Sequence, residues 1–490
     1  MSGLRFQIRQ RIAPSAPRRA DIACFVGFAA RRGSGPLPAA LRDWLTVAGW
    51  LDAPTARPGA EDLRDVPVPV DSWEDFQQLF LWERRGNDPR VGSYLGAAVR
   101  SFFAQGGARC YVVAVAEAPP HDAPMATRQA LLEQLLPGYP GVLSPSPVDP
   151  ASWRGIGHLC GLPDVAMLCV PDLAELLGVE NLPPPLAPPP STPPPEVFVD
   201  CVPTPPSPPA DEAVAALAAP RCDAAGYGQW ARILGALTDW LARFRREVQV
   251  LAAVPLPTVG IDNPLALAET ANLDSRFLQL VYPWVRGDDP APLPAGLESP
   301  EGLLAGVLAR SILARGAFRS AAGAGLRGVQ ALEPALGEAQ QAVLVRRVSL
   351  LGATPTGLRL LGDITTSSDP THHPAPVVRL LGVLLREARR LGETAVFETS
   401  GERLWGRLRN RLESLLLALY GAGALRGASP AEAFQVRCDR STMSQNDIDN
   451  GRVVARVVFA PALPIEQITV VLSLASDGAV SLLDPGREAA

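Results

Sequence analysis

Residues 91–115 read VGSYLGAAVRSFFAQGGARCYVVAV. The first part, 94–105, has the apolar spacing of a helix, and Gly106 and Gly107 follow it as a left-handed stop. The second part, 109–115, is a continuous apolar run. Such a run is typical of a strand that is buried on both faces of a mostly parallel sheet, with helices covering the sheet. This stretch therefore predicts an α/β fold.

The same alternation of helices and strands continues on both sides of this stretch. Other apolar runs predict strands at 22–28, 165–170, 248–254 and 277–282, and amphipathic segments predict helices at 72–80 and 223–247. In the last third, helices are expected at 377–391 and 402–420, and strands at 395–397, 433–438, 452–459, 468–474 and 480–483. We predict a mixed α/β protein with a mostly parallel sheet, followed by a second, C-terminal α/β domain with extended terminal strands.

Length and proline content predict the domain organisation. A chain of 490 residues is long enough for several domains. We place an N-terminal arm and linker at 1–20, a large α/β domain at 21–350 and a C-terminal domain at 351–490. Proline dominates 181–209, where it removes backbone donors and fixes extended geometry. We therefore expect a solvent-facing insertion there, outside any packed sheet.

The N-terminal arm alternates between apolar and polar side chains. Leu4, Phe6, Ile8 and Ile12 share one parity, and arginine takes most positions of the other parity. This period of two predicts a strand, and two prolines directly after it predict an extended tether. Because an isolated strand is not stable in water, this strand must pair with a sheet edge, in its own chain or in another.

Charge and hydropathy exclude several classes of protein. All 45 basic residues are Arg; residues 1–20 carry five Arg and no acid, and 351–490 carry 15 of each, which leaves 21–350 with a net charge of −10. A chain-wide nucleic-acid surface is therefore not expected. Apolar stretches end well before the roughly 20 residues that a bilayer requires, and no signal segment opens the chain. We expect synthesis in the cytoplasm, a soluble product and no direct membrane insertion.

The residue types that carry chemistry form no recognisable catalytic or metal motif. The seven cysteines have no CxxC spacing and are expected to be small buried hydrophobes. The loop GFAARRGSG at 27–35 lacks both phosphate-loop patterns, so Arg31 and Arg32 are expected in a solvated turn, although they could meet an anion. We expect no catalytic residue, no cofactor and no metal. The alternation alone also permits an α/β nucleotide-binding enzyme, which we keep as an alternative.

One histidine pair leaves a metal site conceivable. His372 and His373 lie near Asp363 and Asp369 in a proline-flanked segment. We expect a surface loop there.

Taken together, several segments resemble the sheath proteins of contractile phage tails and related contractile injection systems. No single one of these segments is diagnostic of the family, but the order in which they follow one another over 21–472 is. Besides 91–115, the segments are DIACFVGFAARRG (21–33), VPVPVDSWEDFQQLF (66–80), SPEGLLAGVLARSILARGAFRSAAG (299–323, with Gly306, Ala309 and Arg310), and, as the longest, AVFETSGERLWGRLRNRLESLLLALYGAGALRGASPAEAFQVRCDRSTMSQNDIDNGRVVARVVFAPALPIEQITVVL (395–472).

The resemblance implies a structural subunit and not an enzyme. It implies a homo-oligomer of helical rings around an inner tube, which contracts to drive the tube through a target envelope. Baseplate proteins and other sheath paralogues are implied partners. Assembly would take place in the cytoplasm, and the product would be part of a phage tail or of a tail-like particle that can be released from the cell. A baseplate-proximal sheath variant or adaptor is the alternative within the same particle.

Two sets of residues are candidates for the contacts of such an assembly. The N-terminal strand with Leu4, Phe6, Ile8 and Ile12, and the terminal strand with Ile468, Val470 and Leu472, are candidate strands that one subunit lends to another. On the expected helix 402–420, leucines form a buried stripe, and Arg403, Arg407 and Arg411 recur every four residues on another side. This row either faces an acidic band on the inner tube or is a solvated helix face with Glu402 and Glu413 as local partners.

Overall fold

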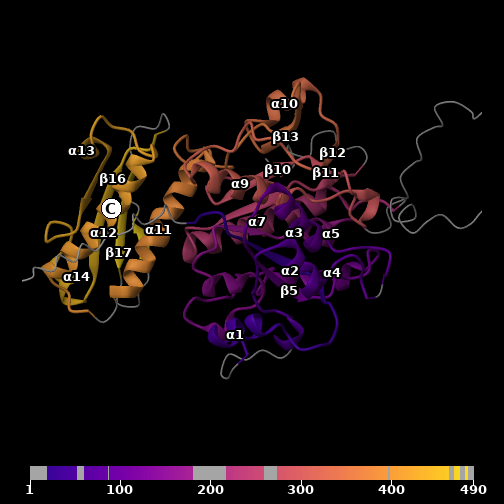
Figure 1. Cartoon of the computed structure of the whole chain (residues 1–490), viewed down its shortest axis with the longest axis horizontal. Helices are drawn as coiled ribbons and strands as arrows, with labels where there is room; N and C mark the ends of the chain where they lie inside the picture. The colour runs from indigo at the N-terminus through magenta and orange to yellow at the C-terminus, as the bar shows by residue number, and fades with distance from the viewer. Residues whose placement is uncertain are drawn as a thin grey trace, which may run out of the picture. The chain divides into compact units, whose positions relative to one another are not determined.

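The computed structural model describes residues 19–51, 60–86, 88–179, 217–258, 273–395 and 398–462, and the backbone of 468–474 and 480–483. The chain divides into a larger unit, Ala20–Val378, and a smaller unit that begins at Arg379. Each unit has a sheet of its own (Figure 1). Among the helices of the described residues, none is long and apolar enough to span a bilayer. The predicted arm strand at 4–12 and the proline-rich stretch at 181–209 lie outside the described residues.

An eight-stranded sheet forms the centre of the larger unit, in the order β14-β13-β10-β8-β6-β1-β5-β3. The strands from β13 to β5 run parallel, and β14 and β3 pair antiparallel at the two edges. The predicted mostly parallel sheet is confirmed, with all five predicted strands present. The strands are β1 Ala23–Phe28, β3 Val68–Val70, β5 Cys110–Ala116, β6 Met167–Cys169, β8 Gln249–Ala253, β10 Leu278–Tyr282, β13 Ser349–Thr354 and β14 Gly357–Leu360.

Helices cover both faces of this sheet because its central strands are apolar on both sides. Every residue of β1, β8 and β10 is buried. On one face, Phe28 and Val26 belong to a core that includes Trp230 and Trp240 of the helix predicted at 223–247. On the other face, the Phe25 ring lies 5.5 Å from the ring of Phe102. The helices are α1 Ala39–Val47, α2 Trp73–Leu79, α3 Tyr94–Gln105, α4 Met125–Leu135, α5 Leu173–Leu177, α7 Ala224–Phe244, α9 Glu301–Arg315 and α10 Glu338–Leu344.

Local capping fixes where two of the predicted helices begin and end. Ser72 Oγ accepts a hydrogen bond from the Asp75 N–H (3.1 Å) at the start of α2, and Ser93 Oγ accepts one from the Gly96 N–H (3.1 Å) at the start of α3. α3 ends at Gly106, whose φ of 105° favours glycine. The predicted left-handed stop is therefore confirmed.

Short elements complete the larger unit, and most of them pair with one another. β2 pairs with β4, β7 with β9, and β11 with β12. These elements are β2 Ala30–Arg31, β4 Phe80–Leu81, β7 Arg221–Cys222, β9 Leu256–Pro257, β11 Trp284–Gly287 and β12 Val329–Glu333, with short 3₁₀ helices at Ala60–Asp62, Pro150–Ser152, Gly155–Gly161 and Pro294–Gly296.

The boundary between the two units lies at a different position in the chain from the predicted one. We placed the boundary at 350/351, whereas the structure divides the chain between Val378 and Arg379. The reason is the hairpin of β13 and β14, which joins the large sheet through β10. The boundary falls inside helix α11, Ala375–Ala395.

The smaller unit contains a four-stranded antiparallel sheet in the order β15-β16-β17-β18. Its predicted helices and most of its predicted strands are present. The predicted strand at 395–397 is wrong at Ala395, which is the last residue of α11, and 396–397 lie outside the described residues. The further elements are α12 Glu402–Gly421, α13 Pro430–Ala433, β15 Phe434–Arg437, α14 Gln445–Asp449, β16 Val453–Phe459, β17 Ile468–Leu474 and β18 Val480–Leu483.

Helices α3 and α9 approach each other closely because glycines lie between them. A Cβ atom at Gly302 would lie 2.0 Å from the Ala98 carbonyl oxygen, and one at Gly306 would lie 2.4 Å from the Phe102 carbonyl oxygen. Both distances are far shorter than van der Waals contact, so backbone meets backbone there. This contact explains the glycine of the Gly306, Ala309 and Arg310 motif.

We predict that Gly306→Ala destabilises the protein by about 1–3 kcal/mol, because the added methyl group forces the two helices apart. Gly235→Ala in α7 is the matched control, since a Cβ atom there meets nothing within 4 Å. Alanine should stabilise that helix by about 0.5–1 kcal/mol. Denaturant midpoints of the two variants should therefore shift in opposite directions. Equal shifts of the same sign would contradict this account of the α3–α9 contact.

Candidate functional site

The carboxyl ends of β1 and β6 meet where the strand order reverses, which is the usual ligand-binding crevice of a doubly wound sheet. Here the side chain of Asp172 fills that position. Its carboxylate accepts hydrogen bonds from the backbone N–H groups of Phe28 (2.9 Å) and Leu95 (3.4 Å). A Cβ atom at Gly27 would lie 2.0 Å from Asp172 Oδ2, so only glycine leaves room for this carboxylate. The chain thus occupies its own crevice.

Glu175 and Arg85 extend this group, and with Asp172 we call them the buried ionic cluster. Arg85 Nη2 lies 2.8 Å from Glu175 Oε1, and the two side chains are 0% and 7% exposed. The Arg85 guanidinium also donates to the carbonyl oxygens of Gly92 and Pro119. Arg85 therefore connects Gly92, Pro119 and Glu175, which lie far apart in the sequence. Its hydrogen bonds compensate for the burial of the ion pair.

Burial sets the protonation of Asp172. Desolvation, together with the nearby Glu175 carboxylate, raises the pKa of Asp172 to about 8, although the two backbone N–H groups and Arg85 favour the charged form. An unfolded aspartate titrates near a pKa of about 3.9. Between these two values the folded state holds the extra proton, so this group's contribution to stability falls as the pH rises from about 4 to 8.

Sequence analysis missed the buried ionic cluster, although a signal was present. Asp172 and Glu175 interrupt an apolar run, PDLAELL at 171–177, directly after a strand. Carboxylates in such a run are costly unless they are paired or protonated, so they indicate a buried partner. The partner, Arg85, lies 90 residues away in the sequence, and no spacing rule connects the two.

The loop after β1 holds its arginines by contacts within the chain. Arg31 donates to the carbonyl oxygen of Glu61 (2.6 Å), and both Asp62 and the Gly35 carbonyl oxygen lie near it. Arg32 Nη2 lies 2.6 Å from both carboxylate oxygens of Glu83. Both guanidinium groups therefore have acceptors in the chain, as expected for a turn on the surface.

The histidine pair lies in a loop that borders a surface pocket of about 890 Å³. His372 Nδ1 lies 2.7 Å from Asp369 Oδ2, whereas Asp363 accepts from Gln279 (2.9 Å) and from the Ala321 N–H (2.8 Å). The structure thus separates the two aspartates that the sequence placed together. Among the described residues, no group of three or more potential metal ligands occurs.

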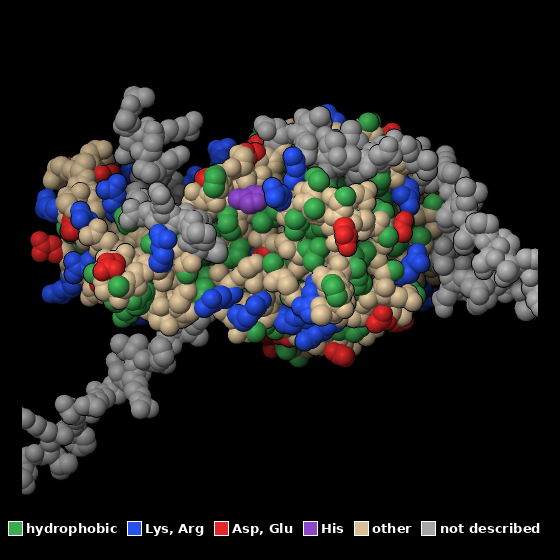
Figure 2. Space-filling model, turned by 90° about the horizontal axis from the view of Figure 1, so that it is seen from above, with side chains coloured by type: hydrophobic (Ala, Val, Ile, Leu, Met, Phe, Trp, Pro, Cys, Tyr) green, Lys and Arg blue, Asp and Glu red, His purple; other side chains and the backbone are tan. Residues whose placement is uncertain are grey.

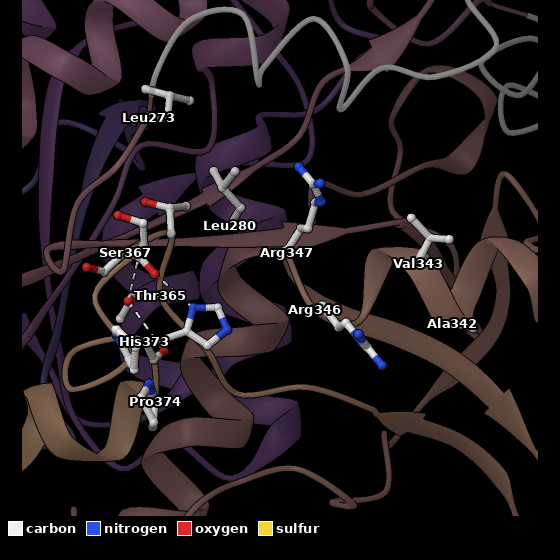
Figure 3. A pocket seen from close by; sticks show the side chains of 13 residues that line it. Leu273, Leu280, Ala342, Val343, Arg346, Arg347, Thr365, Ser367, His373 and Pro374 are labelled. Carbon is white, nitrogen blue, oxygen red and sulfur yellow. Dashed lines mark hydrogen bonds between the residues drawn. The ribbon is translucent and has the colours of Figure 1, made fainter. Parts of the chain in front are cut away.

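Side chains of the loop line one side of that pocket. Figure 3 shows His373, Thr365 and Ser367 gathered there, with Arg346 and Arg347 on a different segment. Thr365 Oγ1 donates to the His372 carbonyl oxygen (2.7 Å), and His373 Nδ1 lies 2.9 Å from the Ser367 carbonyl oxygen. These polar groups therefore stabilise the shape of their own loop.

Helix α12 presents its predicted two faces. The buried face contains the predicted leucine stripe, Leu404, Leu408, Leu412, Leu415 and Leu419, and packs against β15 and β16. Arg403, Arg407 and Arg411 are all exposed. Arg407 forms an ion pair with Glu398, and Glu413 pairs with Arg409 (3.8 Å) instead of with a member of the row. Arg403 and Arg411 have no acidic partner among the residues that the structure describes.

The terminal strands pair within the chain. Ile468, Val470 and Leu472 lie on β17, which has β16 on one side and β18 on the other. β15 and β18 are the edge strands of this sheet. The lending of a terminal strand to a neighbour stays a prediction, as does that of the N-terminal strand.

The surface of the larger unit mixes all types of side chain. Figure 2 shows hydrophobic, acidic and basic side chains on one face, with several basic ones gathered along one border. Because the chain contains no lysine, these basic side chains are arginines.

Comparison with known proteins gives a fold and no sequence family. No family model and no curated protein matches the chain. Several solved structures resemble it over nearly its full length. A chain of the anti-feeding prophage baseplate in the contracted state has a TM-score of 0.58 and 19% identity, covering 99% of this chain and 98% of that chain.

Two further structures are sheaths. A chain of the anti-feeding prophage helical sheath in the contracted state has a TM-score of 0.53 and 21% identity, covering 96% of this chain and 98% of that chain. A chain of the PVC sheath complex of an extracellular contractile injection system, also contracted, has a TM-score of 0.53 and 18% identity, covering 96% and 97%.

The class that these likenesses define is a fold, a mixed α/β protein with two units. The chain has the fold of the sheath proteins of contractile injection systems. The fold class and the resemblance to sheath proteins, both read from the sequence, are confirmed at the level of the fold.

We predict that Asp172→Asn flattens the pH dependence of stability. In the wild type, the melting temperature should fall as the pH rises from 5 to 8, because Asp172 must lose its proton in a buried site. Asparagine cannot titrate, so the variant should show a smaller fall, whatever its melting temperature at pH 5. Asp43→Asn on the exposed side of α1 makes the same substitution at a carboxyl group in contact with solvent and serves as the control. A variant that keeps the full wild-type slope would contradict the assigned role of Asp172.

Proposed function

We propose that this chain is a structural subunit of a contractile sheath. Its copies would polymerise as helical rings around an inner tube and contract to drive the tube through a target envelope. The observation that carries the proposal is the likeness over 96% of the chain to subunits of two sheaths in their contracted state. Because the likeness covers both units, it favours a role shared by the whole chains over the sharing of a single domain.

The occupied crevice supports a structural role over the alternative of a nucleotide-binding enzyme. In a doubly wound fold, a nucleotide would bind at the carboxyl ends of the strands beside the switch point. Asp172 fills that place in this chain, and its carboxyl group would also repel a phosphate when ionised. The proposed function requires no cofactor at that position.

The two units would have different places in the assembly. We assign the larger unit to the outer layer and the smaller unit to the layer that faces the tube. Edge strands β15 and β18 of the smaller sheet offer unpaired backbone groups, which is what strand addition requires. A neighbour's N-terminal strand, with Leu4, Phe6, Ile8 and Ile12, would add to such an edge and keep the lattice connected while it shortens.

Contraction would need no bound fuel. If the extended lattice is kinetically trapped and the contracted lattice is more stable, each subunit contributes a small free-energy drop that the array sums. The particle would be assembled in the cytoplasm and could then be released, as part of a phage tail or an injection device. Other sheath paralogues would be partners in the same particle.

A baseplate-proximal role is the second candidate, and one observation favours it. The likeness with a TM-score of 0.58 is to a chain of a baseplate, whereas the sheath chains score 0.53. A minor sheath subunit that forms only the rings next to the baseplate would account for this. Such a subunit would bind baseplate or sheath partners without forming long tubes by itself.

Negative-stain microscopy of the purified chain tests the proposed function. We expect tubular polymers from the chain alone or with its tube protein, and no thermal shift with nucleotides. Short rings that form only with baseplate components would favour the second candidate. A monodisperse monomer under all of these conditions would refute both.

We further predict that Arg403→Glu with Arg411→Glu weakens binding to the inner tube by about tenfold or more, because two attractive contacts become repulsive in every subunit. Arg407 is left in place because it holds Glu398. Arg426→Glu with Arg440→Glu is the control, since both side chains are exposed outside α12 and the charge change is equal. Co-sedimentation with the tube measures the effect. If the two double variants bind the tube equally, the row does not face it.

A further inference from the structure

Four arginines gather where α9 ends, and we call Arg310, Arg315, Arg327 and Arg359 the basic loop surface. Between Glu301 and Glu333 the sequence carries four arginines and no acidic residue. Arg359 joins this stretch from β14, because its strand pairs with the loop at Gly325. Arg315 and Arg327 are exposed, and Arg310 and Arg359 are partly exposed.

Backbone carbonyl groups, and not carboxylates, hold these guanidinium groups. Arg310 Nη2 donates to the Gly325 carbonyl oxygen (2.6 Å), Arg359 Nη1 donates to that of Gly323 (2.6 Å), and Arg315 Nη2 donates to that of Ser320 (3.0 Å). Within the described residues, none of the four makes an ion pair. The charges are therefore positioned but not neutralised.

The loop that carries this surface has a defined shape. The Gly323 N–H donates to the Leu360 carbonyl oxygen (2.7 Å), and the Leu326 N–H donates to that of Leu358 (3.0 Å). The loop thus continues the sheet beyond β14. Burial and the nearby positive charge of Arg327 lower the pKa of Arg310. Like charges therefore lie close together in this surface. A preformed positive surface of this kind fits an anionic partner.

The chain itself contains a segment of complementary charge. Residues 180–216 carry five acidic residues and no basic residue. They are Glu180, Glu196, Asp200, Asp211 and Glu212. The segment contains the proline-rich insertion predicted at 181–209.

The acidic segment and the basic loop surface adjoin different strands of the large sheet. The segment leaves the described chain after Val179, beyond the carboxyl end of β6, where the Val179 N–H donates to the Arg221 carbonyl oxygen (2.9 Å). The basic loop surface adjoins the edge strand β14, which β13, β10 and β8 separate from β6. Contact between two such different surfaces on two copies is head-to-tail, and head-to-tail contacts generate open polymers.

We propose that the basic loop surface binds the acidic segment 180–216 of a neighbouring copy of this chain. The proposal deepens the proposed self-assembly and rests on it for the presence of a neighbour. It gives the insertion a function, which is to link the larger units of successive subunits by charge pairing. The contact should weaken with salt, because the arginines of the basic loop surface are at least partly exposed.

Photo-cross-linking of the full chain tests this contact. A photoreactive phenylalanine analogue replaces Phe198, between Glu196 and Asp200, and natural and ¹⁵N-labelled copies are mixed at low ionic strength. Mass spectrometry then identifies the cross-linked peptides. We expect cross-links from position 198 to residues 310–327 that join a labelled to an unlabelled copy. Pairs of one isotope alone would place the contact within a single chain and overturn the proposal.

Charge reversal supplies the control for this experiment. Arg315→Glu with Arg327→Glu should lower the yield of mixed cross-links at least about fivefold, and adding Glu196→Arg and Asp200→Arg should restore it. Arg232→Glu with Arg243→Glu, on the exposed side of α7, should leave the yield unchanged. An equal yield in all variants would overturn the charge-pairing proposal. Tubes that form without this cross-link would refute only this inference, whereas the cross-link without tubes would refute only the proposed function.

Discussion

The buried carboxylate of Asp172 is the constraint around which the larger unit is arranged. Its two backbone donors, Phe28 and Leu95, belong to the end of β1 and to α3, so one side chain ties the central strand to the helix layer. The missing side chain at Gly27 and the Glu175–Arg85 ion pair depend on the same geometry. A fold that usually presents a ligand crevice here instead closes it.

The surfaces of the two units have the character that an assembly requires. The smaller unit has two sheet edges and an exposed arginine row on α12, and the larger unit has a preformed basic loop surface. Each of these features leaves a hydrogen-bonding group or a charge without a partner among the described residues. An open sheet edge is a template for strand pairing, and an unneutralised charge attracts a group of opposite charge, so both features suit contact with other chains.

The helices and strands could be predicted from the sequence better than their grouping into two units. Continuous apolar runs indicated five strands of the large sheet, and Gly106 marked the end of a helix, because these signals are local. The boundary between the units was misplaced because the hairpin β13–β14 has no local sign that it joins β10. The buried ionic cluster was missed for the same reason, since Arg85 and Glu175 meet only in the folded chain. Helical periodicity places Arg403, Arg407 and Arg411 on the exposed side of α12, whereas their contact with a tube stays a prediction.

The central claim is that this chain acts by assembling with copies of itself around a tube. A helical reconstruction by cryo-electron microscopy of the chain mixed with its tube protein tests the claim most directly. The account predicts a continuous layer of subunits with the smaller unit against the tube and a neighbour's N-terminal strand at an edge of its sheet. A reconstruction that shows a bare tube, or subunits whose larger unit faces the tube, would contradict it.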